Sequence, residues 1–270
     1  MGLASLVQRT ARVLGRRLAS GSIPRLGQTS DDTRKAIAAA FVRGDGIEIG
    51  ALHNPLIVPP TARVKYVDRM NVADLRRHYP ELANKPLVET DIVDDGETLA
   101  TIADATQDFV IANHFIEHCE NPLLTFHHLF RVLKPAGIVF MAVPDKRFTF
   151  DADRPCTTLD HLLRDFSEGP VWSNRQHYEE WTRLVNKRTD PSEVQAEAQR
   201  LIDMKYSIHF HVWSAPELLE LVQALQRTVR FELELFLRNG IESLLILRKT
   251  SSSGSIGAEV ELRAPARSGE

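Results

Sequence analysis

The sequence has few cysteines and no long apolar run, and these two absences exclude several classes of protein. Only two cysteines occur among 270 residues, Cys119 and Cys156, which argues against a disulfide scaffold and indicates a reducing compartment. No apolar run is long enough to span a bilayer. The net charge of −3 also gives no electrostatic basis for binding nucleic acid. We therefore expect a globular, cytoplasmic protein without a nucleic-acid partner.

Acidic residues are missing from the first 30 positions, which contain five arginines. Apolar residues recur among these arginines at helical spacing: Leu3, Leu6, Val7, Val13, Leu14 and Leu18. Such a helix can lie on an anionic membrane surface, serve as a transit peptide, or pack on the domain that follows. We expect three parts: an N-terminal extension (1–29), a single domain (30–250), and a disordered tail rich in Ser, Gly and charge (251–270).

The first predicted strand is followed by a loop that lacks the later glycines of a dinucleotide site. The segment Gly46-Ile-Glu-Ile-Gly50 predicts this strand, and Val64–Val67 predicts a second one that ends at Asp68. A pyrophosphate needs further glycines and a helix N-terminus, whereas S-adenosylmethionine (SAM) carries no phosphate. Glu48 suits the ammonium group of SAM, and Asp68 can accept both hydroxyls of a ribose. An ordinary turn, with Asp68 as a helix cap, is the alternative.

The rest of the chain alternates strands and helices. Further strands are predicted at 87–90, 108–112 and 137–143, helices at 31–42, 71–82, 121–133 and from Ser214, and a hairpin at 230–237 and 241–248 around Asn239-Gly240. Asp91 follows the predicted third strand. It can accept the exocyclic amine of an adenine while Ile92 covers the ring, or it belongs to a solvated acidic loop.

These segments resemble class I SAM-dependent methyltransferases of the type 11-like kind. The motifs that carry the resemblance are Gly46-Ile-Glu-Ile-Gly50, Asp68, Asp91-Ile92, Asp108-Phe-Val-Ile-Ala-Asn-His-Phe-Ile-Glu-His118 and Arg131-Val-Leu-Lys-Pro-Ala-Gly137. The resemblance implies a Rossmann-like α/β fold with a seven-stranded, mostly parallel sheet and an antiparallel last strand. It implies SAM as cofactor, held by Glu48, Gly50, Asp68, Asp91, Ile92, Asn113 and His114.

Residues 145–213 form an insert that we expect to cap the cofactor and select the substrate. It contains all three tryptophans and several polar side chains. Tryptophan faces beside Asp, Arg and His suit a saccharide, and the sequence is similar to methyltransferase-like proteins of glycan assembly. The substrate candidates are Asp145, Arg147, Asp151, Arg154, His161, Trp181 and Trp213. The alternative is that the aromatic residues form the insert's own core.

Transfer to a hydroxyl of a small molecule or glycan needs a base, and histidine is well suited to that role near neutral pH. The candidate catalytic residues are His114, His209 and His211. In Ile208-His-Phe-His-Val212 both histidines point the same way if the segment is extended.

Two other classes of function remain open. His114-Phe-Ile-Glu-His118 matches the inverted zinc-peptidase pattern, with Glu117 as base and Glu193 or Glu197 as a downstream ligand. Histidines of the insert are a related option for a metal, although we expect none. The incomplete glycine loop also allows a non-catalytic module that binds SAM or acts as a scaffold.

Overall fold

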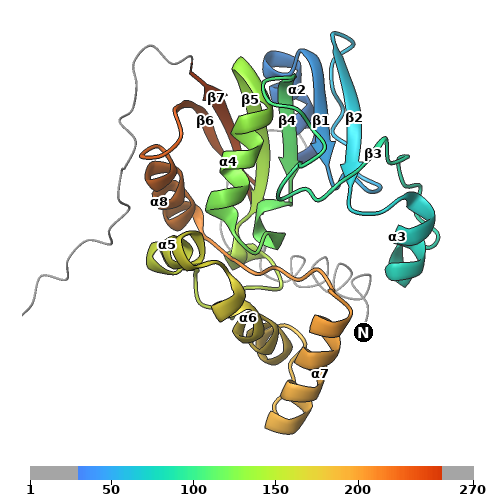
Figure 1. The fold of residues 1–270 in the computed structure, drawn as a ribbon, viewed down its shortest axis with the longest axis vertical. Helices are drawn as coiled ribbons and strands as arrows, with labels where there is room; N and C mark the ends of the chain where they lie inside the picture. Colours follow the sequence, from blue (N-terminus) through green and yellow to red (C-terminus); the bar gives the residue numbers. More distant parts are fainter. Residues whose placement is uncertain (1–29, 251–270) are drawn as a thin grey trace, which may run out of the picture.

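One seven-stranded sheet organises the part of the chain that the structure, a computed structural model, describes, residues 30–250. The strand order is β3-β2-β1-β4-β5-β7-β6, in which β1 to β5 are parallel and β7 is antiparallel to both neighbours (Figure 1). The bounds are β1 Gly44–Ile49, β2 Ala62–Asp68, β3 Ile92–Val93, β4 Gln107–Asn113, β5 Leu133–Pro144, β6 Phe231–Asn239 and β7 Glu242–Lys249. This confirms the predicted Rossmann-like sheet with its antiparallel last strand.

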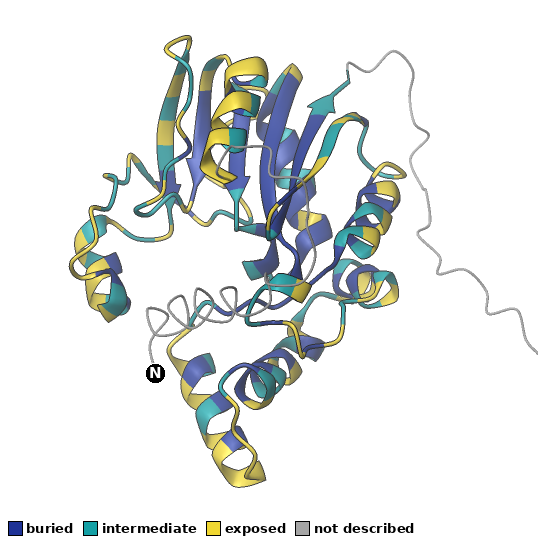
Figure 2. Cartoon of the chain, turned by 180° about the vertical axis from the view of Figure 1, so that it is seen from behind, coloured by how far each residue is buried: buried dark blue, intermediate teal, exposed yellow. Residues whose placement is uncertain are grey.

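Helices cover both faces of the sheet because its central strands are apolar on both sides. On β4, Phe109 and Ile111 belong to one core with Ala38, whereas Val110 and Ala112 belong to the main core on the other face. Successive side chains of a strand point to opposite faces, which explains this division. The covering helices are α2 (Ser30–Phe41) on the first face and α4 (Pro122–Val132) and α8 (Ala215–Leu225) on the second. Figure 2 shows the central strands as the most continuously buried part.

The predicted helix starts agree with the structure because their capping side chains form the expected bonds. Asn71 accepts from the backbone N–H of Asp74 at the start of α3 (Val72–His78), and Asn121 caps α4 through Leu124. Ser214 and Glu217 form a capping box at the start of α8. Pro80 ends α3 as predicted, since the short helix η1 (Pro80–Leu82) begins there.

The predicted position of the third strand is wrong. Residues 87–90 form no strand, and β3 consists of Ile92 and Val93, which lie level with Val67 and Asp68. The backbone N–H of Val88 instead donates to the carbonyl of Leu52, 2.8 Å away in the loop after β1. Because this loop takes the hydrogen bond that a sheet would need, the chain reaches β2 only at Asp91, whose backbone N–H donates to the carbonyl of Tyr66, and the strand begins at Ile92.

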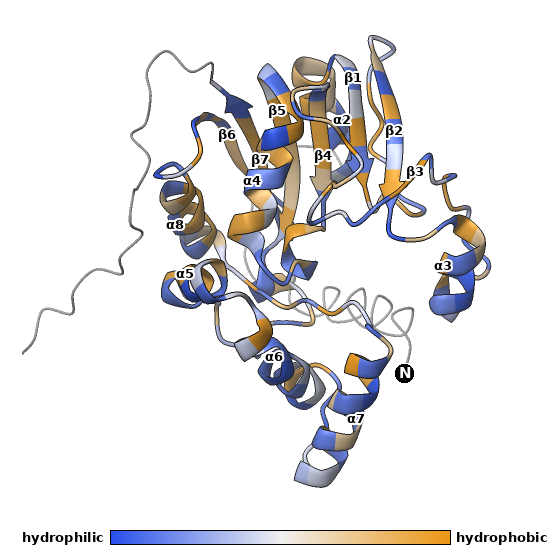
Figure 3. Ribbon diagram, viewed as in Figure 1, coloured by the Kyte–Doolittle hydropathy of each residue, from blue (hydrophilic) through white to orange (hydrophobic). Residues whose placement is uncertain are grey.

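Residues 145–213 form a helical cap beyond the carboxyl ends of the parallel strands (Figure 1). It contains η3 (Lys146–Phe148), α5 (Leu159–Glu168), α6 (Val171–Leu184) and α7 (Pro191–Asp203). Leu162 and Leu163 of α5 join the main core, whereas α6 and α7 share a smaller core around Trp181. Figure 3 shows α7 largely hydrophilic and the sheet strands largely hydrophobic. The cap therefore has one end fixed to the sheet and a core of its own.

The predictions for the two ends of the chain lie outside the described residues. These are the basic helix within 1–29 and the tail 251–270. Among residues 30–250, no helix is long and apolar enough to cross a membrane.

Candidate active site at the carboxyl edge of the sheet

The strand order reverses between β1 and β4, and two predicted cofactor residues lie at this point. The two strands pair in parallel with Glu48 level with Ile111, so the same register brings Gly50 level with Asn113. Ligands of open α/β sheets bind outside the carboxyl ends of strands at such a reversal. Gly50 and Asn113 therefore lie where a ligand of this fold is expected.

Gly50 leaves space beside the backbone directly after β1. Its φ is +64°, in the left-handed region that favours glycine, and a Cβ added here would find no heavy atom within 4 Å. The absence of a side chain at Gly50 thus allows the turn and also leaves the space beside it open. A ligand can approach the backbone at this position.

Asn113, the last residue of β4, has an unused hydrogen-bonding amide. Its side-chain nitrogen and oxygen are both buried, and neither has a hydrogen-bond partner among residues 30–250. A buried amide without partners is costly, and most such groups in folded proteins are satisfied. Asn113 can therefore offer a donor and an acceptor to a ligand at this edge.

His114 follows Asn113 and is held by α2 and β7. Its Nε2 lies 2.8 Å from Glu242 Oε2 and 2.8 Å from Arg34 Nη2, and Arg34 also pairs with Glu242. Burial alone would raise the pKa of Glu242, but bonds from His114 and Arg34 lower it to about 2. An ionised carboxylate therefore fixes the His114 ring at the sheet edge, and its Nε2 is already engaged.

Asp68 lies at the end of β2 as predicted, and it is partly buried. Burial raises the pKa of its carboxyl group, although hydrogen bonds from the backbone of Met70 and Arg69 act in the opposite direction. These two bonds orient the carboxylate beside the start of the next loop. Their geometry also agrees with the alternative in which Asp68 stabilises a turn.

Asp91 does not lie at a strand end, which corrects the position predicted for it. It precedes β3, is exposed, and its Oδ2 accepts the backbone N–H of Tyr66 at 2.8 Å. The acid level with the sheet edge is Asp94, whose carboxylate accepts from Thr101 and Asp95. Ile92 is partly buried against the main core.

Glu48 is buried and closes the loop that follows β1. Both carboxylate oxygens accept the backbone N–H of Leu56, at 2.9 and 3.1 Å. Burial raises the pKa of Glu48 to about 7, although Leu56 and Arg34 act to lower it. Glu48 thus fixes the path of residues 50–55, the loop on which Gly50 begins.

Glu117, His118 and His209, here called the sheet-edge cluster, meet just beyond β4. Each offers one ligand atom, and these atoms all lie within 4.8 Å of one another. Burial raises the pKa of Glu117 to about 7 and lowers that of His118 to about 3. His118 Nδ1 lies 2.9 Å from the carbonyl of Ile208, which orients the ring. Such a set can relay a proton or hold a metal ion.

The inverted zinc-peptidase prediction is wrong because its motif does not form an α-helix. Residues 116–118 form the 3₁₀ turn η2, so His114 bonds to Glu242 while His118 turns toward His209. The predicted downstream ligands also lie elsewhere, since Glu193 and Glu197 on α7 form ion pairs with Arg188 and Arg200.

His209 belongs to a buried ionic network within the cap. Its Nδ1 lies 2.7 Å from Asp151 Oδ2, and Arg154 donates to Asp151, Glu180 and the carbonyl of His209. Burial alone would raise the pKa of Asp151, but His209 and Arg154 lower it below its usual range. Asp151 is therefore ionised and can hold the His209 ring in one orientation, as in a His–Asp pair.

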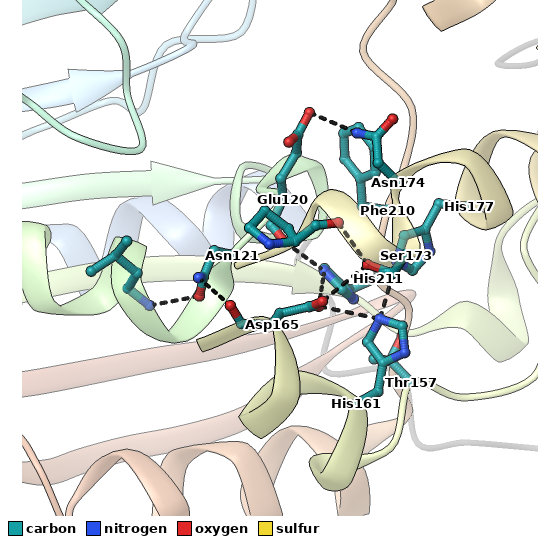
Figure 4. A network of polar contacts seen from close by, with 12 residues as sticks. Glu120, Asn121, Thr157, His161, Asp165, Ser173, Asn174, His177, Phe210 and His211 are labelled. Carbon is teal, nitrogen blue, oxygen red and sulfur yellow. Dashed lines mark hydrogen bonds and ion pairs between the residues drawn. The ribbon is translucent and has the colours of Figure 1, made fainter. Parts of the chain in front are cut away.

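Four further residues, His161, Asp165, His177 and His211, form a second group, here called the cap cluster (Figure 4). His211 was a predicted base, but its side chain is completely buried, which excludes contact with an acceptor in this structure. His209 and His211 therefore join different clusters, although they lie two residues apart. His161 was a predicted substrate residue and instead contacts His177 and Asp165.

The two tryptophans expected to stack on a sugar are not open to a ligand. Trp181 is 5% exposed in the small cap core and Trp213 is 1% exposed in the main core. The alternative, that these aromatic residues form cores, is correct for both. Asp145 is buried and binds the half-exposed Arg147 through both oxygens, so Arg147 keeps a fixed guanidinium at the cap surface.

Several residues of these networks were not among the predicted site residues. Arg34 and Glu242 come from opposite ends of the domain, and Asp165 and His177 come from different cap helices. One signal was present in the sequence: His161 and Asp165 are four apart, a spacing that places side chains on one helix face.

A family model described as a methyltransferase domain matches residues 25–229, which is most of the chain. The search of curated proteins found no match. Among solved structures, the chain is similar to a SAM-dependent methyltransferase from Thermotoga maritima described as a possible histamine N-methyltransferase (14% identity, TM-score 0.44, covering 82% of this chain and 88% of that one). It is also similar to the YcgJ protein of Bacillus subtilis (13% identity, TM-score 0.45, covering 83% of this chain and 99% of that one).

Proposed function

The chain belongs to the methyltransferase-domain family and is a SAM-dependent methyltransferase, and from this premise we propose that it methylates a hydroxyl group of a small-molecule or saccharide acceptor. The observation that carries the proposal is the buried contact between His209 Nδ1 and Asp151 Oδ2, 2.7 Å long. A hydroxyl must lose its proton during methyl transfer, and an oriented imidazole is suited to accept it. Family membership also favours an enzyme over the non-catalytic module.

The residues at the sheet edge fit SAM. Gly50 gives open space next to the backbone, and Asn113 has a buried amide with no partner among residues 30–250. Asp68 would accept the ribose hydroxyls, Ile92 would pack on the adenine, and Glu48 would act on the methionine end by fixing the Gly50 loop. When bound, SAM supplies an electrophilic methyl group on its sulfonium. The adenine role of Asp91 stays a prediction, from a position one residue before β3.

His209 is buried but is more exposed than His211, 7% against 0%, and it would act as the general base. Because Asp151 accepts from Nδ1, the lone pair of the ring lies on Nε2, which is the atom that would take the hydroxyl proton. Asp151 stays ionised and stabilises the imidazolium that results. Arg154 stabilises this carboxylate in turn, through a 2.9 Å bond to its other oxygen. The main contribution of the remaining residues is to position the acceptor.

The saccharide class of acceptor rests on the polar cap surface and not on tryptophan stacking. Arg147 is half-exposed and is fixed by both oxygens of the buried Asp145. A fixed guanidinium presents several donors to neighbouring hydroxyl groups at low entropic cost. Glycan modification in the cytoplasm is the setting that we propose for such a reaction.

The test begins with calorimetric titration of the purified protein with SAM and with its demethylated product. We expect binding of both, followed by turnover with a hydroxyl acceptor from a panel of saccharides, phenols, carboxylic acids and amines. A methyl group that withstands mild base distinguishes an ether from an ester. Turnover confined to amines or carboxylic acids would contradict O-methylation of a hydroxyl, and no SAM binding by the folded protein would contradict the cofactor site.

A further inference from the structure

The cap cluster brings four metal-ligand side chains together from three separate elements. His161 and Asp165 lie one turn apart on α5, His177 lies on α6, and His211 lies on the extended segment before α8. One ligand atom from each lies within 4.8 Å of the other three. Figure 4 shows the four side chains pointing toward one another from these elements. This convergence is independent of the His209–Asp151 pair.

The spacing of these atoms is close to that of a tetrahedral metal site. His161 Nε2 lies 3.1 Å from His177 Nε2 and 3.2 Å from Asp165 Oδ2, and His211 Nε2 lies 3.7 Å from Asp165 Oδ2. Zinc bonds of roughly 2.0–2.1 Å place neighbouring ligand atoms about 3.3 Å apart in a tetrahedron. Small shifts of the rings would therefore complete the coordination.

Two buried atoms of the cap cluster lack hydrogen bonds. Asp165 Oδ2 and His211 Nδ1 have no hydrogen-bond partner within residues 30–250, and both side chains are 0% exposed. No Lys or Arg in this part of the chain forms an ion pair with Asp165. A buried carboxylate without a cation is costly, because burial removes its hydration. A metal ion would supply the positive charge and a partner for Asp165 Oδ2.

The surroundings of the cap cluster orient its ligands. Asp165 Oδ1 accepts from Ser173 Oγ at 2.9 Å, which leaves Oδ2 facing the histidines. His211 Nε2 lies 3.3 Å from the carbonyl of Glu120, which helps to fix the orientation of this ring.

We propose that His161, Asp165, His177 and His211 bind one structural zinc ion that joins three elements of the cap. Three imidazoles and one carboxylate are ligands that zinc accepts, and four protein ligands are typical of a structural site. The ion would join α5, which packs on the main core, to α6 and to the segment that carries His209. The other two elements of the cap would thus be attached to α5, the helix that packs on the main core.

The test is the metal content of the full-length protein, measured by elemental mass spectrometry after chelation and reconstitution with one equivalent of zinc. We expect about one zinc per chain, reduced at least tenfold in Asp165→Asn and His211→Gln. Glu117→Gln and His118→Gln, in the sheet-edge cluster, are the matched controls and should keep the metal. Cobalt reconstitution gives a second measurement, because its visible spectrum reports four-coordinate geometry.

Three outcomes would overturn the proposal. Folded wild-type protein that takes up no zinc would contradict it directly. Zinc retained by both cap-cluster variants but lost from the controls would assign the ion to the sheet-edge cluster. A cobalt spectrum of six-coordinate type in the folded wild-type protein would exclude the closed four-ligand site. The first and third outcomes are measured on wild-type protein. They therefore test the proposal even if the substitutions unfold the cap.

Discussion

The sheet edge and the cap both contain many polar residues, but they use them differently. At the sheet edge, Gly50 adjoins open space and Asn113 has an amide without a partner in the described chain. In the cap, Asp151 and Arg154 are nearly fully buried and satisfy each other and His209. The comparison indicates a division of labour. The sheet edge leaves groups open for a ligand, whereas the cap uses internal bonds to orient His209, the general base that we propose.

The strongest test of this division is the substitution His209→Gln. Loss of a general base reduces the rate by about 10²–10⁴-fold, so we expect kcat to fall by this factor while SAM affinity stays constant. Steady-state kinetics and calorimetry on the same preparation measure the two quantities. His128→Gln on α4, outside both clusters, is the matched control.

A loss of SAM affinity as large as the loss of kcat would show that His209 serves the cofactor. The proposed division between the sheet edge and the cap would then be wrong. An unchanged kcat in the presence of saturating acceptor would remove His209 as the base.

Trp181→Ala tests whether the cap aromatics form a core or bind the acceptor. Trp181 is 5% exposed and contacts Phe150 edge-to-face at 5.4 Å. Truncating a buried tryptophan costs about 3–5 kcal/mol of unfolding free energy, and we expect a loss in this range by urea denaturation. Trp181→Phe should retain most of the stability. A raised KM for the acceptor without loss of stability would instead restore Trp181 to the acceptor site.

Asp68→Ala tests the sheet edge alone. Loss of charge-assisted hydrogen bonds to a ribose costs about 1.5–3 kcal/mol, so SAM affinity should fall roughly tenfold to a hundredfold, as measured by calorimetry. Glu89→Ala, which removes an exposed acid near the same edge, should leave the affinity unchanged. Equal affinities for wild-type protein and Asp68→Ala would show that Asp68 only stabilises its own turn.

The smallest effect concerns Glu242 and pH. Its pKa in the folded protein is about 2, below its ordinary value of 4.5, so the folded state binds fewer protons than the unfolded state. The resulting stability is complete above about pH 4.5 and is lost as the pH falls toward 2, by about 1 kcal/mol per unit at most. Between pH 5 and 3, the unfolding free energy measured by urea denaturation should fall less steeply with pH in Glu242→Gln than in wild-type protein. Identical slopes would contradict the low pKa.

The sheet was predictable from sequence because its signals are local. A continuous apolar run such as Gly137–Val143 predicts a doubly covered strand, and Ser214 with Glu217 predicts a helix start. Leu87–Thr90 was misassigned because the backbone N–H of Val88 donates to the carbonyl of Leu52, in a loop 36 residues earlier. Apolar pattern alone does not reveal such a partner.

The cap networks were less predictable because they join residues far apart in the chain. His118 meets Ile208 across 90 positions, and Asn121 donates to Asp165 across 44. The sequence indicated that His209 and His211 could matter, but their separation into two clusters depends on which helices surround each ring. Residue type suggested the chemistry here, and tertiary packing decided the assignment.

The hydrogen bonds of Arg34 and Glu242 to His114 determine when this site can form during synthesis of the chain. Glu242 lies on the last strand, and Asn239 also bonds back to Ser30 at the start of α2. When residues 30–213 have emerged from the ribosome, every residue of the sheet-edge cluster and the cap cluster and every predicted SAM residue is present. His114 still lacks the Glu242 carboxylate that holds it. The completed contact therefore forms only after residue 242 has also emerged from the ribosome and β7 has joined the sheet.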